Sequence, residues 1–226
     1  MSDKTNSANF REIKNKQDEL VLAATDLAVI VFPYGENPGP IVDNETGELL
    51  PLADGGIPLG EIQKNAGVEL SPEMSTEGIF GYGSRAQRRV FVTEEGFTIN
   101  LTVQEITKLA YQMFMSIEDK DIVTEGKVTR MQKRSSSSVQ YYTLVLIAKD
   151  LAREGDIFPF WVFPKVSVTQ KGQMSLAEAS EMGMPLTFTV FEEDGLQFEI
   201  GLGGEGWPEL AQKAGFTEAT PVTPEG

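Results

Sequence analysis

The sequence contains neither histidine nor cysteine, and these two absences exclude several classes of catalytic and metal site. Without cysteine the chain can form no disulfide framework and no thiolate zinc site. Without histidine it has no imidazole base, no Ser-His-Asp or Cys-His arrangement and no ordinary transition-metal site. The catalytic arrangements that use imidazole or thiol groups are therefore excluded.

Long apolar runs and basic charge are also scarce. No stretch approaches about 18 uninterrupted apolar residues, the length that a membrane-spanning helix needs. The polar segment 1–17 lacks the apolar core of a secretory signal peptide, so we expect the protein to fold in the cytoplasm where it is made. The 226 residues carry 19 Lys and Arg against 34 Asp and Glu, a formal charge of −15. A protein this acidic repels nucleic-acid phosphates rather than binding them.

Short apolar segments predict a mainly β protein. The run from Leu27 to Phe32 is rich in β-branched residues and ends at Pro33, whereas 139–148 is apolar on both faces, which is typical of a central strand. Turn-like sequences predict hairpins at 94–96 and 192–195. We expect strands at 27–32, 57–62, 68–70, 89–93, 97–101, 139–148, 158–168, 185–191 and 196–202.

Helical signals are fewer. A capping box at Thr102-Val-Gln-Glu105 precedes apolar residues at helical spacing, which predicts the main helix over 103–117. A second capping box at 175–178 predicts a short helix, and Pro208 and Gly215 bracket the last one. Together with the strands, these helices indicate an α+β, mainly β fold, a sandwich or barrel with helices packed outside.

Composition divides the chain into a β-rich body and two terminal segments. Two long loops interrupt the body, and loops of this length are usually functional or insertions. We expect an N-terminal arm or helix at 1–26 with a thin helical stripe over 10–23, the body at 27–216, the long loops at 35–56 and 118–138, and a C-terminal tail at 217–226.

A glycine-rich excursion at 71–88 combines apolar, aromatic and basic side chains between two expected strands. Such apolar residues are costly when they stay exposed, and aromatic residues and arginine dominate protein interfaces. The excursion therefore predicts an interface, and the alternative is a loop that folds back on its own domain. The candidate interface residues are Ile79, Phe80, Tyr82, Arg85, Arg88 and Arg89.

The motif Gly201-Leu-Gly203-Gly-Glu-Gly206 fits the GxGxxG pattern of dinucleotide sites. Such a site needs a βαβ unit and an acidic residue about twenty positions further on. Only twenty residues follow, no second strand is expected there, and Glu205 would lie where a pyrophosphate should bind. A glycine turn into the terminal helix is the better interpretation.

Acidic clusters supply the remaining catalytic and metal hypotheses. Glycoside hydrolysis needs two carboxylates across a cleft, one of them with a raised pKa. The acids at 94–95 and 192–194 fall at expected hairpin tips, so they read as ordinary turn acids. The segment 43–48 loosely resembles a calcium loop but lacks the ligand spacing, which favours a hairpin turn near Thr46-Gly47.

The segment 120–134 is basic in an otherwise acidic chain. Nucleic-acid surfaces of this kind usually interleave aromatic residues with the basic ones, and no aromatic residue stands between Lys127 and Arg134. The segment therefore indicates a solvated loop or a docking patch for an acidic neighbour.

The order of these segments resembles the major tail tube protein of long, non-contractile-tailed bacteriophages. The resemblance spans about 27–216, and the loops 35–56 and 125–138 depart from it. It rests on an opening strand, two short central motifs, two late strands and a Trp-to-Phe ending: Ala28-Val-Ile-Val-Phe-Pro33, Leu59-Gly-Glu-Ile62, Gly67-Val-Glu-Leu-Ser71, Phe163-Pro-Lys-Val166, Met184-Pro-Leu-Thr-Phe-Thr189, Gly206-Trp207 and Ala214-Gly-Phe216.

The resemblance implies a structural protein without enzymatic activity or cofactor. Such proteins form hexameric rings that stack into a hollow tube around a tape-measure protein, and the tube later conducts DNA to the host. Each subunit is implied to be a β-sandwich with a flanking helix, whose inner sheet joins those of its neighbours. A tail terminator and a distal tail protein are implied as further partners, and Glu61, Glu69 and Glu94 are our candidates for acids that face the lumen.

Two other functions remain open at this point. One is a carbohydrate- or calcium-binding β-sandwich of an adhesion module, and the other is a carboxylate glycosidase that uses Glu192 or Glu193. A folded tube subunit should expose sheet edges and the excursion 71–88, whereas the other two functions require a converging site.

Overall fold

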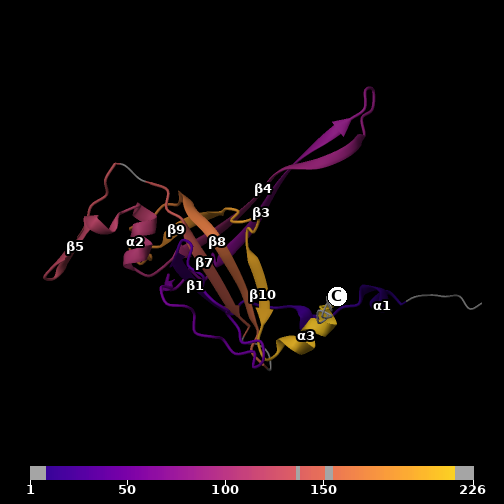
Figure 1. Ribbon diagram of the computed structural model, residues 1–226, viewed down its shortest axis with the longest axis horizontal. Coiled ribbons are helices and arrows are strands. Elements are labelled where there is room, and N and C mark those ends of the chain that lie inside the picture. The colour runs from indigo at the N-terminus through magenta and orange to yellow at the C-terminus, as the bar shows by residue number, and fades with distance from the viewer. Residues whose placement is uncertain (1–8, 136–137, 151–154, 217–226) are drawn as a thin grey trace, which may run out of the picture.

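The computed structural model describes residues 9–135, 138–150 and 155–216, and it is mainly β with short helices (Figure 1). The expected α+β, mainly β fold class is confirmed. The segments 1–8 and 217–226, parts of the expected N-terminal arm and C-terminal tail, lie outside the described residues. The strands are β1 (Asp26–Pro33), β2 (Ile57–Pro58), β3 (Val68–Phe80), β4 (Gln87–Val103), β5 (Ile122–Glu125), β6 (Val128–Met131), β7 (Tyr142–Lys149), β8 (Phe158–Lys171), β9 (Met184–Val190) and β10 (Glu199–Gly203).

The helices are short. None in the described ranges is long and apolar enough to cross a membrane. They are α1 (Phe10–Lys14), α2 (Lys108–Met115) and α3 (Trp207–Ala214), with 3-10 turns η1 (Asp18–Leu20) and η2 (Asp119–Asp121).

One antiparallel sheet of eight strands forms the body, in the order β2-β1-β7-β8-β9-β4-β3 with β10 also paired to β8. The long strand β8 divides this sheet, because Phe158–Val162 pairs with β10 whereas the part from Val166 to Lys171 pairs with β9. We call β3, β4, β9 and the second part of β8 the β4–β9 layer, and β2, β1, β7, β10 and the first part of β8 the β1–β7 layer.

The two layers enclose a common core. Val29 and Val31 of β1 pack in the same buried cluster as Ile99 of β4 and Phe188 of β9. Helix α2 closes this core with Ala110, Met113 and Phe114. Burial of this apolar surface is the main force that holds the two layers together.

The loop 35–56 covers the other face of the β1–β7 layer. Ile30, Phe32 and Val145 form a second cluster there with Ile41 of the loop. This second cover explains why the central strands are apolar on both faces. The expected small hairpin in the loop is confirmed by the bridge between Val42 and Leu49.

Two expectations for this region are wrong. No hairpin turn lies at 94–96, and most of 71–88 belongs to strands rather than to an excursion between strands. Glu94 pairs with Ser75 and Glu95 with Met74, so β3 and β4 continue as one long ribbon whose turn lies at 81–86. The β-sheet ladder on both sides of Gly96 keeps this stretch extended, although Glu-Glu-Gly reads locally as a turn.

The expected start of the main helix is also wrong. Thr102 pairs with Pro185 in the β4–β9 ladder, and the helix begins five residues later, where the Oγ1 of Thr107 accepts a hydrogen bond from the N–H of Ala110 at 3.1 Å. The helix ends at Ser116, whose φ of 52° is left-handed. Pairing within the sheet therefore overrides the local capping signal of Thr102-Val-Gln-Glu105.

Four further expectations differ from the structure, and only that for β9 and β10 is overturned by pairing with a distant strand. The stripe over 10–23 is helical only in α1 and briefly in η1, and 175–178 forms no helix. The expected turn at 192–195 is confirmed by the antiparallel bridge between Glu193 and Leu196, but β9 and β10 do not continue it as a hairpin, because each joins β8. The polar loop 118–138 contains the β5–β6 hairpin. The last helix is confirmed as α3, with Pro208 in its first turn and Gly215 in a left-handed cap at φ 89°.

Candidate assembly surfaces

A two-stranded ribbon projects from the body, and we call its residues 72–95 the arm (Figure 1). Nearly every residue of the arm is exposed, whereas β4 becomes buried in alternate positions from Phe97 onward. The arm does not fold back on its own body, and this answers the structural alternative that the sequence left open for 71–88.

Large apolar side chains lie exposed on the arm. Phe80 is 54% exposed and Tyr82 is fully exposed at the tip. Since consecutive side chains of a strand point to opposite sides, the run from Val90 to Val92 places apolar groups on both faces of the ribbon. An isolated two-stranded ribbon is marginally stable in water, and apolar surface of this kind marks interaction sites. The exposed apolar set is Met74, Ile79, Phe80, Tyr82, Val90, Phe91 and Val92.

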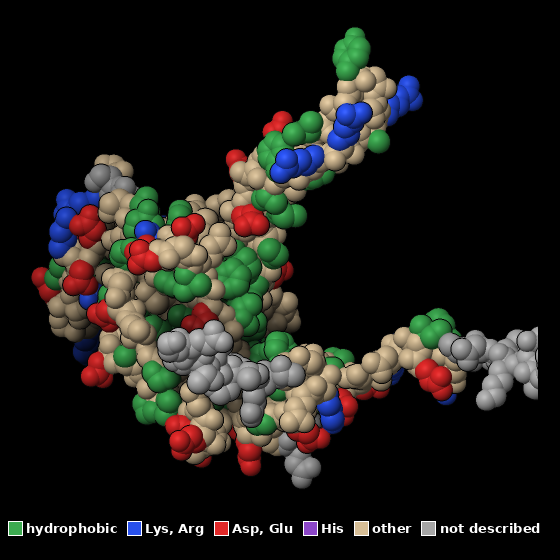
Figure 2. Space-filling model, turned by 45° about the vertical axis from the view of Figure 1, so that its right-hand side comes forward, with side chains coloured by type: hydrophobic (Ala, Val, Ile, Leu, Met, Phe, Trp, Pro, Cys, Tyr) green, Lys and Arg blue, Asp and Glu red, His purple; other side chains and the backbone are tan. Residues whose placement is uncertain are grey.

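Charge is separated along the arm. Its outer part carries Arg85, Arg88 and Arg89, and none of the three forms an ion pair with any residue that the structure describes. Figure 2 shows basic side chains from the middle of the arm to its outer end among hydrophobic ones, and acidic side chains from the middle of the arm to its base. The six residues named from the sequence are thus brought together on one projecting element.

A polar face lies on the outer side of the β4–β9 layer. The alternation that buries Ile99 and Leu101 turns Thr98 and Asn100 outward, and Thr187 of β9 donates a hydrogen bond to the Oδ1 of Asn100 at 2.7 Å. We define this polar face by Glu69, Ser71, Thr98, Asn100, Thr102, Thr187 and Thr189.

Two of the three candidate lumen acids lie on the side of the ladder that carries the polar face. Glu69 pairs with Asn100, and Glu94 lies on the same side of β4, six residues before Asn100. Glu61 lies elsewhere, in the segment before β3, where its backbone carbonyl accepts a hydrogen bond from Gln104 at 2.9 Å. In the sequence, Phe97, Ile99 and Leu101 alternate with Thr98 and Asn100, which predicts one buried and one solvent-exposed face for this strand but does not reveal that β9 extends the exposed face.

The outer edge of β3 is a second assembly feature. In the described ranges no strand pairs with the side of β3 that faces away from β4. Unpaired N–H and C=O groups at such an edge are available to a strand of another chain. The β4–β9 layer therefore ends in an edge that can be extended.

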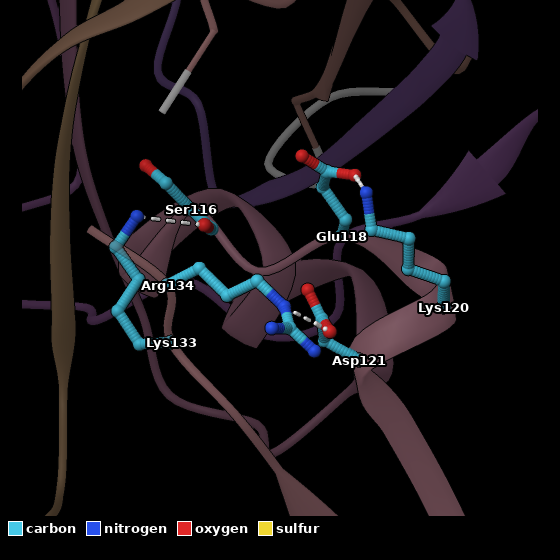
Figure 3. A network of polar contacts seen from close by, with 6 residues as sticks. All are labelled: Ser116, Glu118, Lys120, Asp121, Lys133 and Arg134. Atoms are coloured by element: carbon cyan, nitrogen blue, oxygen red, sulfur yellow. Dashed lines mark hydrogen bonds and ion pairs between the residues drawn. The ribbon is translucent and has the colours of Figure 1, made fainter. Parts of the chain in front are cut away.

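The basic segment 120–134, near α2, makes ion pairs and hydrogen bonds with neighbouring residues of its own chain (Figure 3). The Nε of Arg134 donates to the Oδ1 of Asp121 at 2.7 Å, and the Asp121 side chain is only 5% exposed. The Nζ of Lys133 donates to the carbonyl oxygen of Ser116 at 3.0 Å, where a cation also suits the C-terminal end of α2. Arg130, on β6, lies 3.5 Å from Glu125. With the ion pair between Lys120 and Glu118, these contacts pair four of the five basic side chains of 120–134 with neighbouring groups of the same region.

Glu193, in the acidic segment 192–194, forms a polar cluster with Tyr34 and Lys165, which we call the clasp. Glu193 accepts hydrogen bonds from the Oη of Tyr34 at 2.5 Å and from the Nζ of Lys165 at 2.6 Å. These bonds, that from Lys165 first, lower the pKa of Glu193. A glycosidase acid needs a raised pKa, so this geometry opposes that role for Glu193.

The other catalytic and metal motifs have structural explanations. The Oδ1 of Asp43 accepts from the backbone N–H groups of Glu45 and Thr46 at 2.8 and 2.7 Å, which lowers the pKa of Asp43 and forms the expected turn. Among the described residues no three acidic side chains converge to hold a metal ion.

The glycines of 201–206 serve close packing. A Cβ on Gly204 would lie 2.1 Å from the carbonyl oxygen of Asp156, and one on Gly201 would overlap the ring of Phe160. Gly206 precedes α3 as its N-cap. The expected glycine turn between a strand and the terminal helix is confirmed.

A model of the phage tail tube protein family matches residues 53–199, which include the arm, the polar face and the β3 edge. The chain belongs to the phage tail tube protein family. It is therefore a structural component of the virion tail, as the resemblance implied. The expectation of a protein without enzymatic activity is consistent with a structural family.

Among curated proteins none matches this chain. A similar solved structure is the 6-fold symmetrised cryo-EM structure of the anti-feeding prophage (AFP) baseplate, with a TM-score of 0.42 and 11% sequence identity over 80% of this chain and 95% of that chain.

Proposed function

We propose that this protein assembles with copies of itself into hexameric rings, which stack into the hollow tail tube that carries phage DNA to the host. The observation that carries the proposal is the arm, which extends exposed apolar and arginine side chains away from the body. A single subunit gains nothing from such an element, because the ribbon contributes no side chain to the buried core. Copies that cover one another's arms remove this surface from water.

The β4–β9 layer supplies the wall of the tube in this proposal. Neighbouring copies extend the sheet from the β3 edge, and the polar face turns toward the bore. Four strands from each of six subunits give a barrel of about 24 strands, about 115 Å around and roughly 37 Å across at the backbone before strand tilt widens it. Duplex DNA passes through such a bore.

Charge favours passage without binding. The chain has a formal charge of −15, and the polar face carries Glu69 with Glu94 further along the same side. An acidic, hydroxyl-rich wall repels phosphates and so keeps DNA from adhering. We assign the tape-measure protein to the bore before DNA passes, and the tail terminator and distal tail protein to the two ends of the tube, with assembly in the host cytoplasm.

Electron microscopy of the concentrated protein tests the proposal. Negative-stain images should show rings of six subunits and stacked tubes of uniform width. A protein that stays monomeric at every concentration, with no ring in any image, would contradict it.

A further inference from the structure

The molecule contains a pocket at the end opposite to the arm, and we call it the end pocket. Its volume is about 650 Å³, and it lies between the loop 39–47, the end of β10 and the start of α3. Figure 1 shows the arm at one end of the molecule and the end of β10 with α3 at the other. Close packing shapes the pocket, since a Cβ on Gly47 would lie 2.7 Å from the backbone carbon of Gly204.

The end pocket combines an apolar floor with an acidic rim. Ile41, Val42, Phe160, Val162, Leu202 and Trp207 supply apolar surface. The charged residues that line it are Asp43, Glu45, Glu199 and Glu205, with no lysine or arginine among them. The rim is thus purely acidic, and three of its four carboxylates are exposed.

The arm tip has the complementary composition. It carries three arginines without ion-pair partners in the described ranges, beside the exposed rings of Phe80 and Tyr82. A second cleft, of about 440 Å³, lies between 24–27 and 61–70, but its rim mixes Asp26 and Glu61 with Lys64. Electrostatic complementarity therefore favours the end pocket over this second cleft as the receptor.

We propose that the arm tip of one copy docks in the end pocket of the next copy. Tyr82 and Phe80 contact the apolar floor, and Arg85 and Arg88 face the carboxylates of Glu199 and Glu205. Because the two surfaces differ and lie at opposite ends of the molecule, the contact is heterologous, and it can repeat from one copy to the next. This inference rests on the proposed self-assembly, and it assigns the contact that stacks one ring on the next.

Cysteine cross-linking tests the contact, and the chain has no cysteine of its own to interfere. Assembled Ser84→Cys/Asn44→Cys protein keeps the rings and charges of the contact, and on mild oxidation it should form a ladder of covalent oligomers well beyond the dimer. The matched control is Ser84→Cys/Lys64→Cys, which places the second thiol at the other cleft and should form no ladder. A ladder from the control and none from the first variant would overturn the assignment.

Charge reversal gives an independent test. Arg85→Glu/Arg88→Glu protein and Glu199→Lys/Glu205→Lys protein should each need on the order of 100-fold more protein to polymerise, because like charges face each other across the contact. An equal mixture of the two should recover polymerisation, since the arm of each variant is complementary in charge to the pocket of the other. Circular dichroism checks that each variant keeps the wild-type fold.

The outcomes separate the two proposals. If the wild type forms tubes and Glu199→Lys/Glu205→Lys protein forms them at the same concentration, the end pocket is not the receptor and the tube proposal stands. If reversal at Asp26 and Glu61 rescues the arm variant instead, the second cleft is the receptor. Wild-type protein that never assembles overturns the proposed function itself.

Discussion

The arm and the β5–β6 hairpin are two exposed ribbons with opposite use of their charge. Both carry arginine and exposed apolar side chains, including Phe80 in one and Val128 in the other. At the β5–β6 hairpin, Arg130 pairs with Glu125 and the adjoining Arg134 pairs with Asp121, whereas no arm arginine has an ion-pair partner among the described residues. We therefore expect basic charge to mark an assembly surface where, as on the arm, the fold provides it with no ion-pair partner among the described residues.

The largest expected effect comes from removing the rings at the arm tip. Phe80→Ser/Tyr82→Ser should leave a folded monomer but raise the concentration required for polymerisation on the order of 100-fold or more, since each buried aromatic ring contributes about 1.5–3 kcal/mol. Light scattering and electron microscopy measure assembly. The matched control is Val123→Ser/Val128→Ser on the β5–β6 hairpin, which should polymerise like the wild type. Equal losses in the two variants would erase the distinction between the ribbons.

The next effect is on stability at the tied hairpin. Arg134→Ala leaves the buried Asp121 carboxylate without its charged donor and should lower the free energy of unfolding by about 1–3 kcal/mol. Urea unfolding measures it. Arg130→Ala is the control, because its exposed pair with Glu125 should contribute less than about 1 kcal/mol. An Arg134→Ala variant with an unchanged free energy of unfolding would mean that the ion pair with Asp121 does not stabilise this region.

A smaller effect is expected from the ionic strength, because tube formation should depend on the charges of the arm and not on those of the β5–β6 hairpin. Raising the ionic strength from about 0.1 to about 1 M shortens the Debye length from about 10 to about 3 Å, so tube formation should weaken roughly tenfold. Arg85→Gln/Arg88→Gln protein should assemble poorly but with little further dependence on salt. Lys127→Gln, on the other hairpin, should keep the wild-type salt dependence, and a flattened response there would assign part of the docking charge to that hairpin.

The smallest effect concerns the clasp of Tyr34, Lys165 and Glu193, a third place where charge is used within the fold. Its donors lower the pKa of Glu193 below the ordinary value of 4.5, so its stabilisation is present above that pH and is lost as the pH falls through the lowered value. Thermal unfolding from pH 6 down to 2 should show a steeper loss for the wild type than for Glu193→Gln. Parallel curves would show that the clasp does not contribute.

The sequence predicts the ends of strands and helices correctly where a proline or glycine at that position fixes the backbone. Pro33 ended a β-branched strand, and Pro208 with Gly215 bracketed α3, as the sequence predicts. The residues of the arm tip were identified as a group because aromatic and arginine side chains are rare on an excursion that a single domain must leave in water.

Distant pairing explains what the sequence did not reveal. Glu94-Glu95-Gly96 reads as a turn, but β3 holds it extended, and Thr102 reads as a cap, but β9 holds it in a strand. The end pocket also joins the loop at Gly47 to Gly204, which are far apart in sequence. No local pattern encodes such contacts, because each depends on strands that the chain brings together only in the folded state.

A cryo-electron microscopy map of the assembled protein tests the central claim most directly. The account predicts closed rings in which the β3 edge pairs with a neighbouring copy, the arm reaches the adjacent ring, and Glu69 and Glu94 line the bore. Separate globules whose β3 edge is covered by their own chain, or a bore lined by lysine side chains, would contradict it.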